Sequence, residues 1–168
     1  MNKKPNGFTL IELILYIALV AIFVSGAIIF AWDIIFGRVK ATVHQEVNQN
    51  VRLVSKRIAF EIRNASAINS VTATSISLAS ADPSRNPTVI DLNSGRIRIG
   101  YGNSGNCPIS DPCFLTSNQI SISNLVFTNM SAGNSNNIMY SITAEGIGER
   151  QEWDVSQTVT SSTELRTN

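Results

Sequence analysis

A single carboxylate, Glu12, stands at the start of the longest apolar run of this chain. Inside a bilayer a charged side chain is disfavoured by about 2.5–3.5 kcal/mol at the membrane centre, and by less near the headgroups. Glu12 therefore either reaches the headgroups by itself or requires a cationic partner. No lysine or arginine occurs between Lys4 and Arg38, so such a partner would come from a new amino terminus or from another subunit.

Two cysteines, Cys107 and Cys113, bracket a Pro-Ile-Ser-Asp-Pro loop. In an exported domain this spacing predicts a disulfide that pins the loop. Closing so small a ring would stabilise the fold by about 2–3 kcal/mol in the chain-entropy model. Free thiols are the alternative in a host without an export oxidant. A metal site would need further ligands, and the chain has one histidine.

Catalytic signatures are missing from the sequence, which contains no Gly-x-Ser-x-Gly, phosphate loop, dinucleotide fingerprint or His-rich site. The one histidine, His44, falls on a predicted helix, which argues against a Ser–His–Asp triad. Asp82, Asp91 and Asp111 lack the alternating acidic spacing of a calcium loop. We therefore expect no enzymatic activity, no cofactor and no metal.

The apolar run over residues 13–32 contains 20 uncharged residues. As a helix with about 1.5 Å rise per residue it would span a hydrocarbon core of roughly 30 Å. The run is too long for the apolar part of a secretory signal peptide, and no Ala-x-Ala-like site follows it. It predicts a membrane helix that the mature protein keeps. Lys3 and Lys4 favour a cytoplasmic amino end, although Arg38 and Lys40 flank the other side.

The residues around Glu12 resemble the class III signal of type IV prepilins and pseudopilins. Lys3 and Lys4, then Gly7, then Phe-Thr-Leu-Ile-Glu-Leu over residues 8–13 stand in the order of that signal. In this family an aspartyl prepilin peptidase cuts after the glycine and N-methylates the new first residue. The resemblance, close over about the first 30 residues, implies that Gly7 ends the leader and that Phe8 is the methylated terminus.

The same resemblance implies a role for Glu12, which would pair with the Phe8 ammonium of a neighbouring subunit as helices stack into a filament. The implied partners are prepilin peptidase, other pilin or pseudopilin subunits, an inner-membrane assembly platform with a separate ATPase, and membrane lipid. The implied location is the cytoplasmic (inner) membrane, crossed once with a cytoplasmic amino terminus and an exported head. The subunit would then enter an extracellular or periplasmic filament.

Beyond the membrane segment, apolar residues continue at helical spacing. They recur every three or four residues on one face: Val39, Val43, Val47, Val51, Val54, Ile58, Ile62 and Ala65. No proline lies between Pro5 and Pro83, so one helix is predicted from about Phe8 to about Ile68. Its apolar face needs a cover. Polar residues are expected on its solvated face: His44, Arg52, Lys56, Arg57, Glu61 and Arg63.

The carboxyl-terminal part changes to a period of two, which is typical of strands. Strands are predicted over residues 71–78, 88–92, 96–101, 119–127, 138–144 and 155–165. A Gly-containing turn over residues 93–95 predicts a hairpin, the prolines of residues 82–87 predict a loop, and residues 133–137 predict a turn. The fold class expected is α+β, a long amino-terminal α-helix packed against a carboxyl-terminal antiparallel β-sheet, the pilin-like arrangement.

Four segments follow from these patterns and from the resemblance. We expect a leader at residues 1–7, a transmembrane and polymerisation helix at 8–36, its amphipathic extension at 37–68, and a β-rich globular head at 69–168. Within the head, residues 123–127, 142–143 and 165–168 resemble minor pilins of the J or W kind. The expected function is therefore that of a structural subunit, a minor pilin or pseudopilin of a type IV pilus or type II secretion-like filament.

Two alternatives remain. A DNA-uptake pilin would use basic residues on the head, and Arg96 and Arg98 with Tyr101 are the candidates. Against it, the net charge of +1 creates no strong field, and nucleic acid is not an expected partner. The second alternative is a membrane-tethered surface domain that does not polymerise, which would retain residues 1–7.

Overall fold

The computed structural model of this chain describes residues 8–107, 113–133, 135–148 and 154–166. It divides into two compact units, Met1–Val39 and Lys40–Asn168. The first unit contains the beginning of one long helix, and the second contains the rest of that helix and two antiparallel sheets. The predicted α+β class is confirmed, but the strands form two sheets rather than the single sheet that the sequence predicted.

Helix α1 extends over Leu10–Asn64. Its first turn is capped by Thr9, whose Oγ1 accepts a hydrogen bond from the backbone nitrogen of Glu12 at 3.3 Å. The helix ends before Ile68, where the sequence predicted its end. The reason is that Ile68 belongs to a strand and pairs with Leu78, so these residues exchange helical hydrogen bonds for a sheet ladder.

The first sheet has four antiparallel strands, and their spatial order is their chain order: β1 (Ala67–Val71), β2 (Ser75–Ala79), β3 (Thr88–Asn93) and β4 (Arg96–Tyr101). The single strand predicted over residues 71–78 is wrong. A tight turn interrupts it, where the backbone nitrogen of Ser75 donates to Thr72 Oγ1 at 3.0 Å and that of Thr72 donates to the Ser75 carbonyl at 2.8 Å. The hydroxyl of Thr72 thus supplies a turn without glycine or proline.

The predicted hairpin between β3 and β4 is confirmed. Asn93 and Arg96 are the last paired residues, and Ser94 and Gly95 form the two-residue turn. Their φ angles are 49° and 71°, the left-handed conformation that a type I′ turn requires at both positions. The predicted loop before this hairpin contains a short 3-10 helix, η1 (Pro83–Arg85).

The second sheet consists of three antiparallel strands in chain order: β5 (Ile120–Asn129), β6 (Asn137–Gly146) and β7 (Ser156–Glu164). Its strands were all predicted to within a few residues. On β5 the buried positions change parity, from Ile120 and Ile122 to Leu125 and Phe127. A register shift between Ile122 and Asn124 accounts for this, because a bulge keeps both pairs of side chains on the core face.

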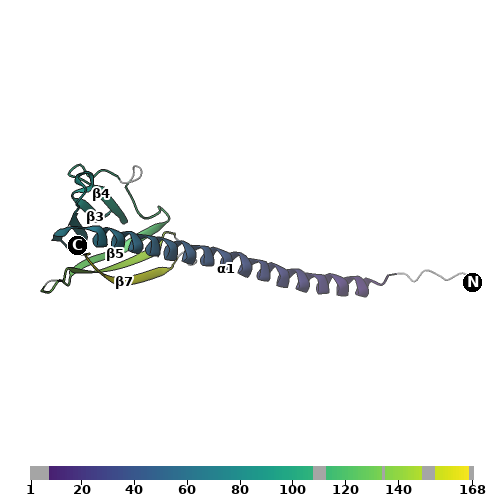
Figure 1. Ribbon diagram of the computed structural model, residues 1–168. Coiled ribbons are helices and arrows are strands. Elements are labelled where there is room, and N and C mark those ends of the chain that lie inside the picture. Colours follow the sequence, from purple (N-terminus) through teal and green to yellow (C-terminus); the bar gives the residue numbers. More distant parts are fainter. Residues whose placement is uncertain (1–7, 108–112, 134, 149–153, 167–168) are drawn as a thin grey trace, which may run out of the picture. The chain divides into compact units, whose positions relative to one another are not determined.

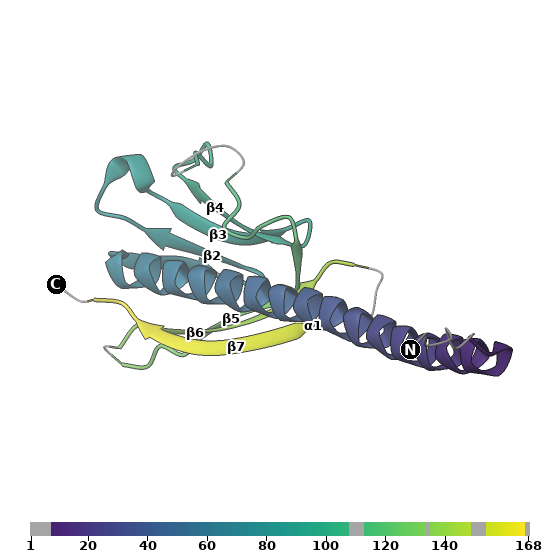
Figure 2. The same cartoon turned by 90° about the vertical axis from the view of Figure 1, so that its right-hand side faces the viewer.

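Within the second unit, α1 lies between the two sheets. Both ribbon views show β3 and β4 on one side of the helix and β5 and β7 on the other (Figure 1 and Figure 2). The predicted apolar stripe forms the core here, and all of the following are buried: Val43, Val47, Val51, Val54, Ile58, Ile62 and Ala65. Val39 is only half-buried. The sheets are thus the cover that the amphipathic face required.

Candidate assembly site on the amino-terminal helix

Side chains on every face of the first part of α1 are exposed. Residues 8–38 are exposed without exception, and large apolar side chains such as Leu10, Ile22 and Phe23 each keep more than 70% of their surface accessible, at 77%, 74% and 76%. By length and composition α1 is the one helix of the described residues that could cross a membrane, and none of its apolar window is buried. Because exposed apolar surface is disfavoured in water, this segment requires lipid or other helices around it.

Glu12 occupies the third position of the first helical turn. Its carboxylate is exposed and forms no ion pair with any described residue. The partial positive charge of the helix amino terminus favours an anion at this position. Thr9 is a residue that the sequence analysis missed, although the Thr-x-x-Glu spacing of a capping box is visible in the sequence. The cap fixes where the helix starts. It therefore fixes the position of Glu12 in the first helical turn.

Aromatic residues mark both ends of the exposed segment. The Phe8 ring stacks on that of Tyr16 with 5.8 Å between centroids, and the Trp32 ring stacks on that of Phe36 at 5.6 Å. Amphipathic aromatic residues are enriched where a membrane meets water. Of the two predicted cleavage-site residues, Phe8 is exposed just before the first turn, whereas Gly7 lies outside the described residues.

In the head, Cys107 and Cys113 form the predicted disulfide, with 4.8 Å between their Cα atoms. The Cys113 carbonyl accepts from the backbone nitrogen of Ile99 at 3.0 Å, which attaches the bridge to β4. The loop between the two cysteines, including Asp111, lies outside the described residues. Among the described residues there is no group of three or more His, Cys, Asp or Glu that could hold a metal ion.

The three DNA-binding candidates each have a partner within the head. Arg98 forms an ion pair with Asp91, with Nη2 to Oδ2 at 2.5 Å and Nε to Oδ1 at 3.0 Å. The hydrogen bond and charge of Asp91 raise the pKa of Arg98 further. Arg96 lies over the Phe114 ring at 4.1 Å and donates from Nε to the Thr116 carbonyl at 3.2 Å. Both cations are thus engaged by neighbouring groups of the head.

The third candidate, Tyr101, belongs to a buried cluster around Glu61. Glu61 is 3% exposed, and its Oε1 accepts from the Tyr101 hydroxyl at 2.9 Å. It also forms ion pairs with Arg57 at 2.9 Å and Arg85 at 2.5 Å. Burial, and then the hydrogen bond to Glu61, raise the pKa of Tyr101. The cluster attaches α1 to the first sheet.

This cluster corrects one prediction. Glu61 and Arg57 were expected on the solvated face of the helix, but Glu61 is buried and Arg57 points to it. The signal was present, because Glu61 stands three residues after Ile58 and next to Ile62, on the buried stripe itself. The other predicted solvated residues are exposed: His44, Arg52, Lys56 and Arg63.

Comparison with known proteins gives one match. A family model described as the prokaryotic N-terminal methylation motif matches residues 2–28. No curated protein and no solved structure matches the chain. The matched segment contains Gly7, Phe8 and Glu12 and most of the exposed apolar part of α1. A motif of this kind implies processing by prepilin peptidase and assembly with other pilins. The match supports a type IV pilin-like family for this chain, and so a structural, membrane-anchored subunit rather than an enzyme.

Proposed function

We propose that this chain is a minor pilin or pseudopilin of the J or W kind, a structural subunit of a type IV pilus or type II secretion-like filament. One observation carries the proposal. The apolar first part of α1, directly after the methylation motif, has no cover from any described residue of its own chain. Such a helix finds an apolar environment in lipid before assembly and among neighbouring helices afterwards.

Processing defines the segments of the proposed subunit. Residues 1–7 form a leader that prepilin peptidase removes between Gly7 and Phe8, and the same enzyme methylates the new Phe8 amine. Residues 8–36 then anchor and polymerise the subunit, residues 37–68 extend the helix, and residues 69–168 form the head. Before assembly the chain crosses the inner membrane once, with its amino terminus in the cytoplasm and its head exported. An assembly platform with a separate ATPase inserts it into the filament.

Glu12 sets the axial position of the subunit in this proposal. Its carboxylate pairs with the Phe8 ammonium of a neighbouring subunit, so both charges are neutralised only when the two helices have the correct offset. Because an unpaired charge in an apolar environment is strongly disfavoured, an incorrect offset is rejected. This proposal is supported by the exposure of Glu12 and by the lack of an ion pair to any described residue.

The two alternatives receive no comparable support. For DNA uptake, Arg96 and Arg98 are engaged with neighbouring side chains and Tyr101 is buried. A tethered surface domain that does not polymerise would explain the apolar helix but not the methylation motif, and it would retain residues 1–7.

The amino terminus of the mature chain tests the proposal. Intact-mass and peptide mass spectrometry of the protein from host membranes should find a chain that begins with N-methyl-Phe8. Gly7→Leu should leave the chain uncut. Gly26→Ala is the matched control, because a Cβ at Gly26 meets nothing within 4 Å, and it should be processed normally. A wild-type chain that still begins at Met1, in cells with active prepilin peptidase, would contradict the proposal.

A further inference from the structure

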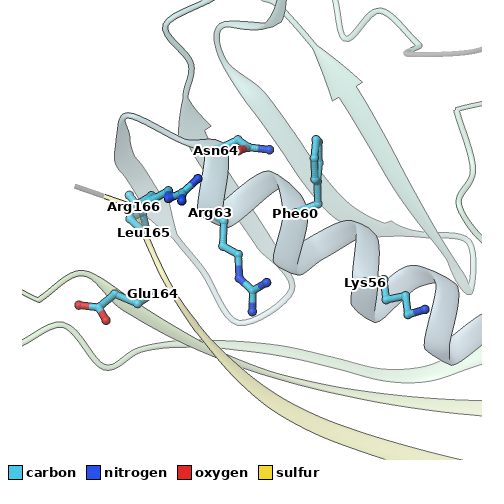
Figure 3. Close-up of a pocket in the computed structure, with 7 residues that line it drawn as sticks. All are labelled: Lys56, Phe60, Arg63, Asn64, Glu164, Leu165 and Arg166. Atoms are coloured by element: carbon cyan, nitrogen blue, oxygen red, sulfur yellow. The ribbon is translucent and has the colours of Figure 1, made fainter. Parts of the chain in front are cut away.

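An open hollow of about 670 Å³ lies beside the last turns of α1 and the end of β7 (Figure 3). Lys56 and Arg63 line it from the helix, and Arg166 lines it from the segment after the strand. Phe60 forms an apolar part of its wall and is 49% exposed. We call this feature the basic hollow. It is defined by three cations and one exposed aromatic ring.

The charge of the basic hollow is not balanced by the described part of the chain. None of the three cations forms an ion pair with a described residue. Glu164 lies at the rim, but its carboxylate accepts from Ser135 Oγ at 2.8 Å and points away from Arg63 (Figure 3). The carboxyl end of the helix adds only about half a negative charge. Three positive charges exceed these two contributions, so the hollow favours an anionic partner.

The opposite end of β7 carries the complementary surface. There Glu145, the partner of Ser156 at the start of the strand, is exposed, as is Asp154. Ile147, two residues after Glu145, is 51% exposed. Backbone hydrogen bonds hold this end together, for example from Gly146 to the Val155 carbonyl at 3.0 Å. We call Glu145, Ile147 and Asp154 the acidic edge. Neither carboxylate forms an ion pair with a described residue.

These two surfaces match in chemistry but cannot meet within one head. Strand β7 has 9 residues, which at about 3.3 Å per residue separates its ends by roughly 30 Å. A second copy displaced along the strand direction would bring the acidic edge of one head to the basic hollow of the next. Such a head-to-tail contact uses two different surfaces, one from each copy.

We propose that the basic hollow binds the acidic edge of a second copy of this chain. Glu145 and Asp154 of one copy would face Lys56, Arg63 and Arg166 of the next, and Ile147 would contact the Phe60 ring. The inference rests on the proposed function, because it assigns a contact between the heads of two neighbouring subunits in the filament. Complementary charges of this kind fix the orientation of an encounter and reject wrong partners.

Cysteine cross-linking of the full chain in host membranes tests the contact. One tagged copy carries Arg63→Cys and a differently tagged copy carries Asp154→Cys, and a short bismaleimide is added. The native cysteines are joined to each other and do not react. We expect a dimer that contains both tags. Arg52→Cys with Asp154→Cys is the matched control, since Arg52 is an exposed arginine of the same helix outside the hollow, and it should give no dimer.

A charge exchange provides the second measurement. With the cross-linking pair moved to Arg166→Cys and Glu145→Cys, Arg63→Glu in the first copy should lower the yield of dimer by about tenfold. Adding Asp154→Arg in the second copy should restore it, because the pair is then reversed rather than lost. A change that simply unfolded the head would not be rescued by a substitution in another molecule.

The outcomes separate this contact from the proposed function. Chains that mature at Phe8 and enter filaments without the two-tag dimer would overturn the contact and leave the proposed function intact. A dimer without maturation would support the contact and contradict the proposed function. A cross-link only to a different protein, or equal yields for the Arg52 control, would also overturn the contact.

Discussion

The two halves of α1 differ in what covers them. Each half contains a glutamate whose surroundings show this difference. In the first half every residue is exposed and Glu12 has no ionic partner among the described residues. In the second half one stripe is fully buried by the two sheets, and Glu61 is enclosed by two guanidinium groups and a tyrosine hydroxyl.

The comparison shows what a carboxylate in an apolar environment requires. Glu61 is tolerated in the core because its charge is compensated and both of its oxygens have partners. Glu12 enters an equally apolar environment in the proposed filament or membrane, and the same physics demands a partner for it. The second half of the helix meets this demand within the chain, whereas in the proposed filament the first half meets it between chains.

The largest expected difference between the two halves is the effect on stability of shortening an apolar side chain. Ile58 is completely buried, so Ile58→Ala should lower the free energy of unfolding of the head by about 2–5 kcal/mol, toward the upper end. Ile17 has the same side chain in the exposed half, and Ile17→Ala should leave head stability unchanged. Urea unfolding of the full chain in detergent, followed by near-ultraviolet circular dichroism, measures both. Equal effects of the two substitutions on unfolding would contradict the claim that only the second half of α1 is part of the core of the head.

The two glutamates give the next contrast. Glu61→Gln leaves Arg57 and Arg85 without a counter-charge and should cost about 3 kcal/mol, at the low end for a broken buried pair because both arginines are about one-third exposed. Glu12→Gln should not change the unfolding of the head. The same urea titration compares them, and a stable Glu61→Gln head would show that the cluster is not structurally important.

Tyr101 adds a pH dependence to the second half. Tyr101→Phe removes the donor to Glu61 and should cost about 1.5–3 kcal/mol near neutral pH. Because the folded state raises the pKa of Tyr101, its contribution is fully present below about pH 10, the unfolded value, and is lost as pH rises through the folded value. Wild type should therefore lose stability from about pH 10 upward, and Tyr101→Phe should lose less. Urea midpoints at several alkaline pH values would detect the difference, and identical slopes would contradict it.

The exposed pair on the first sheet should matter least. Asp91→Asn breaks the ion pair with Arg98, whose side chain is 45% exposed, and should cost less than about 1 kcal/mol. The effect should shrink further in high salt, because mobile ions screen exposed charges. A loss as large as that of Glu61→Gln would mean that burial does not distinguish the two ion pairs.

Local patterns predicted much of this structure. The valine stripe gave the buried face of α1, and the Asn-Ser-Gly turn gave the β3–β4 hairpin, because spacing and backbone conformation alone decide both. The Thr72 turn was missed because the alternation of polar and apolar residues continues through it. The Thr72 hydroxyl stabilises the turn, so no glycine or proline marks it in the sequence. The division into two sheets was missed because β5 follows β4 in the chain without pairing with it, and local alternation does not reveal which consecutive strands pair.

The sites divide in the same way. Phe8 and Glu12 could be selected from the sequence because a contiguous motif carries them. The Glu61 cluster could not, since Arg85 and Tyr101 reach it from 24 and 40 residues along the chain. The basic hollow likewise joins the end of α1 to the end of the chain, and only the fold places these residues together.

Filament incorporation of Glu12 variants tests the central claim most directly. Glu12→Ala and Glu12→Gln both remove the charge, and the share of mature chain in the sheared filament fraction would be compared with wild type. The account predicts that both variants are cleaved at Phe8 and held in the membrane, with folded heads, but do not enter filaments. Incorporation at the wild-type level would contradict it, because the first half of the helix would then assemble without a partner for Glu12.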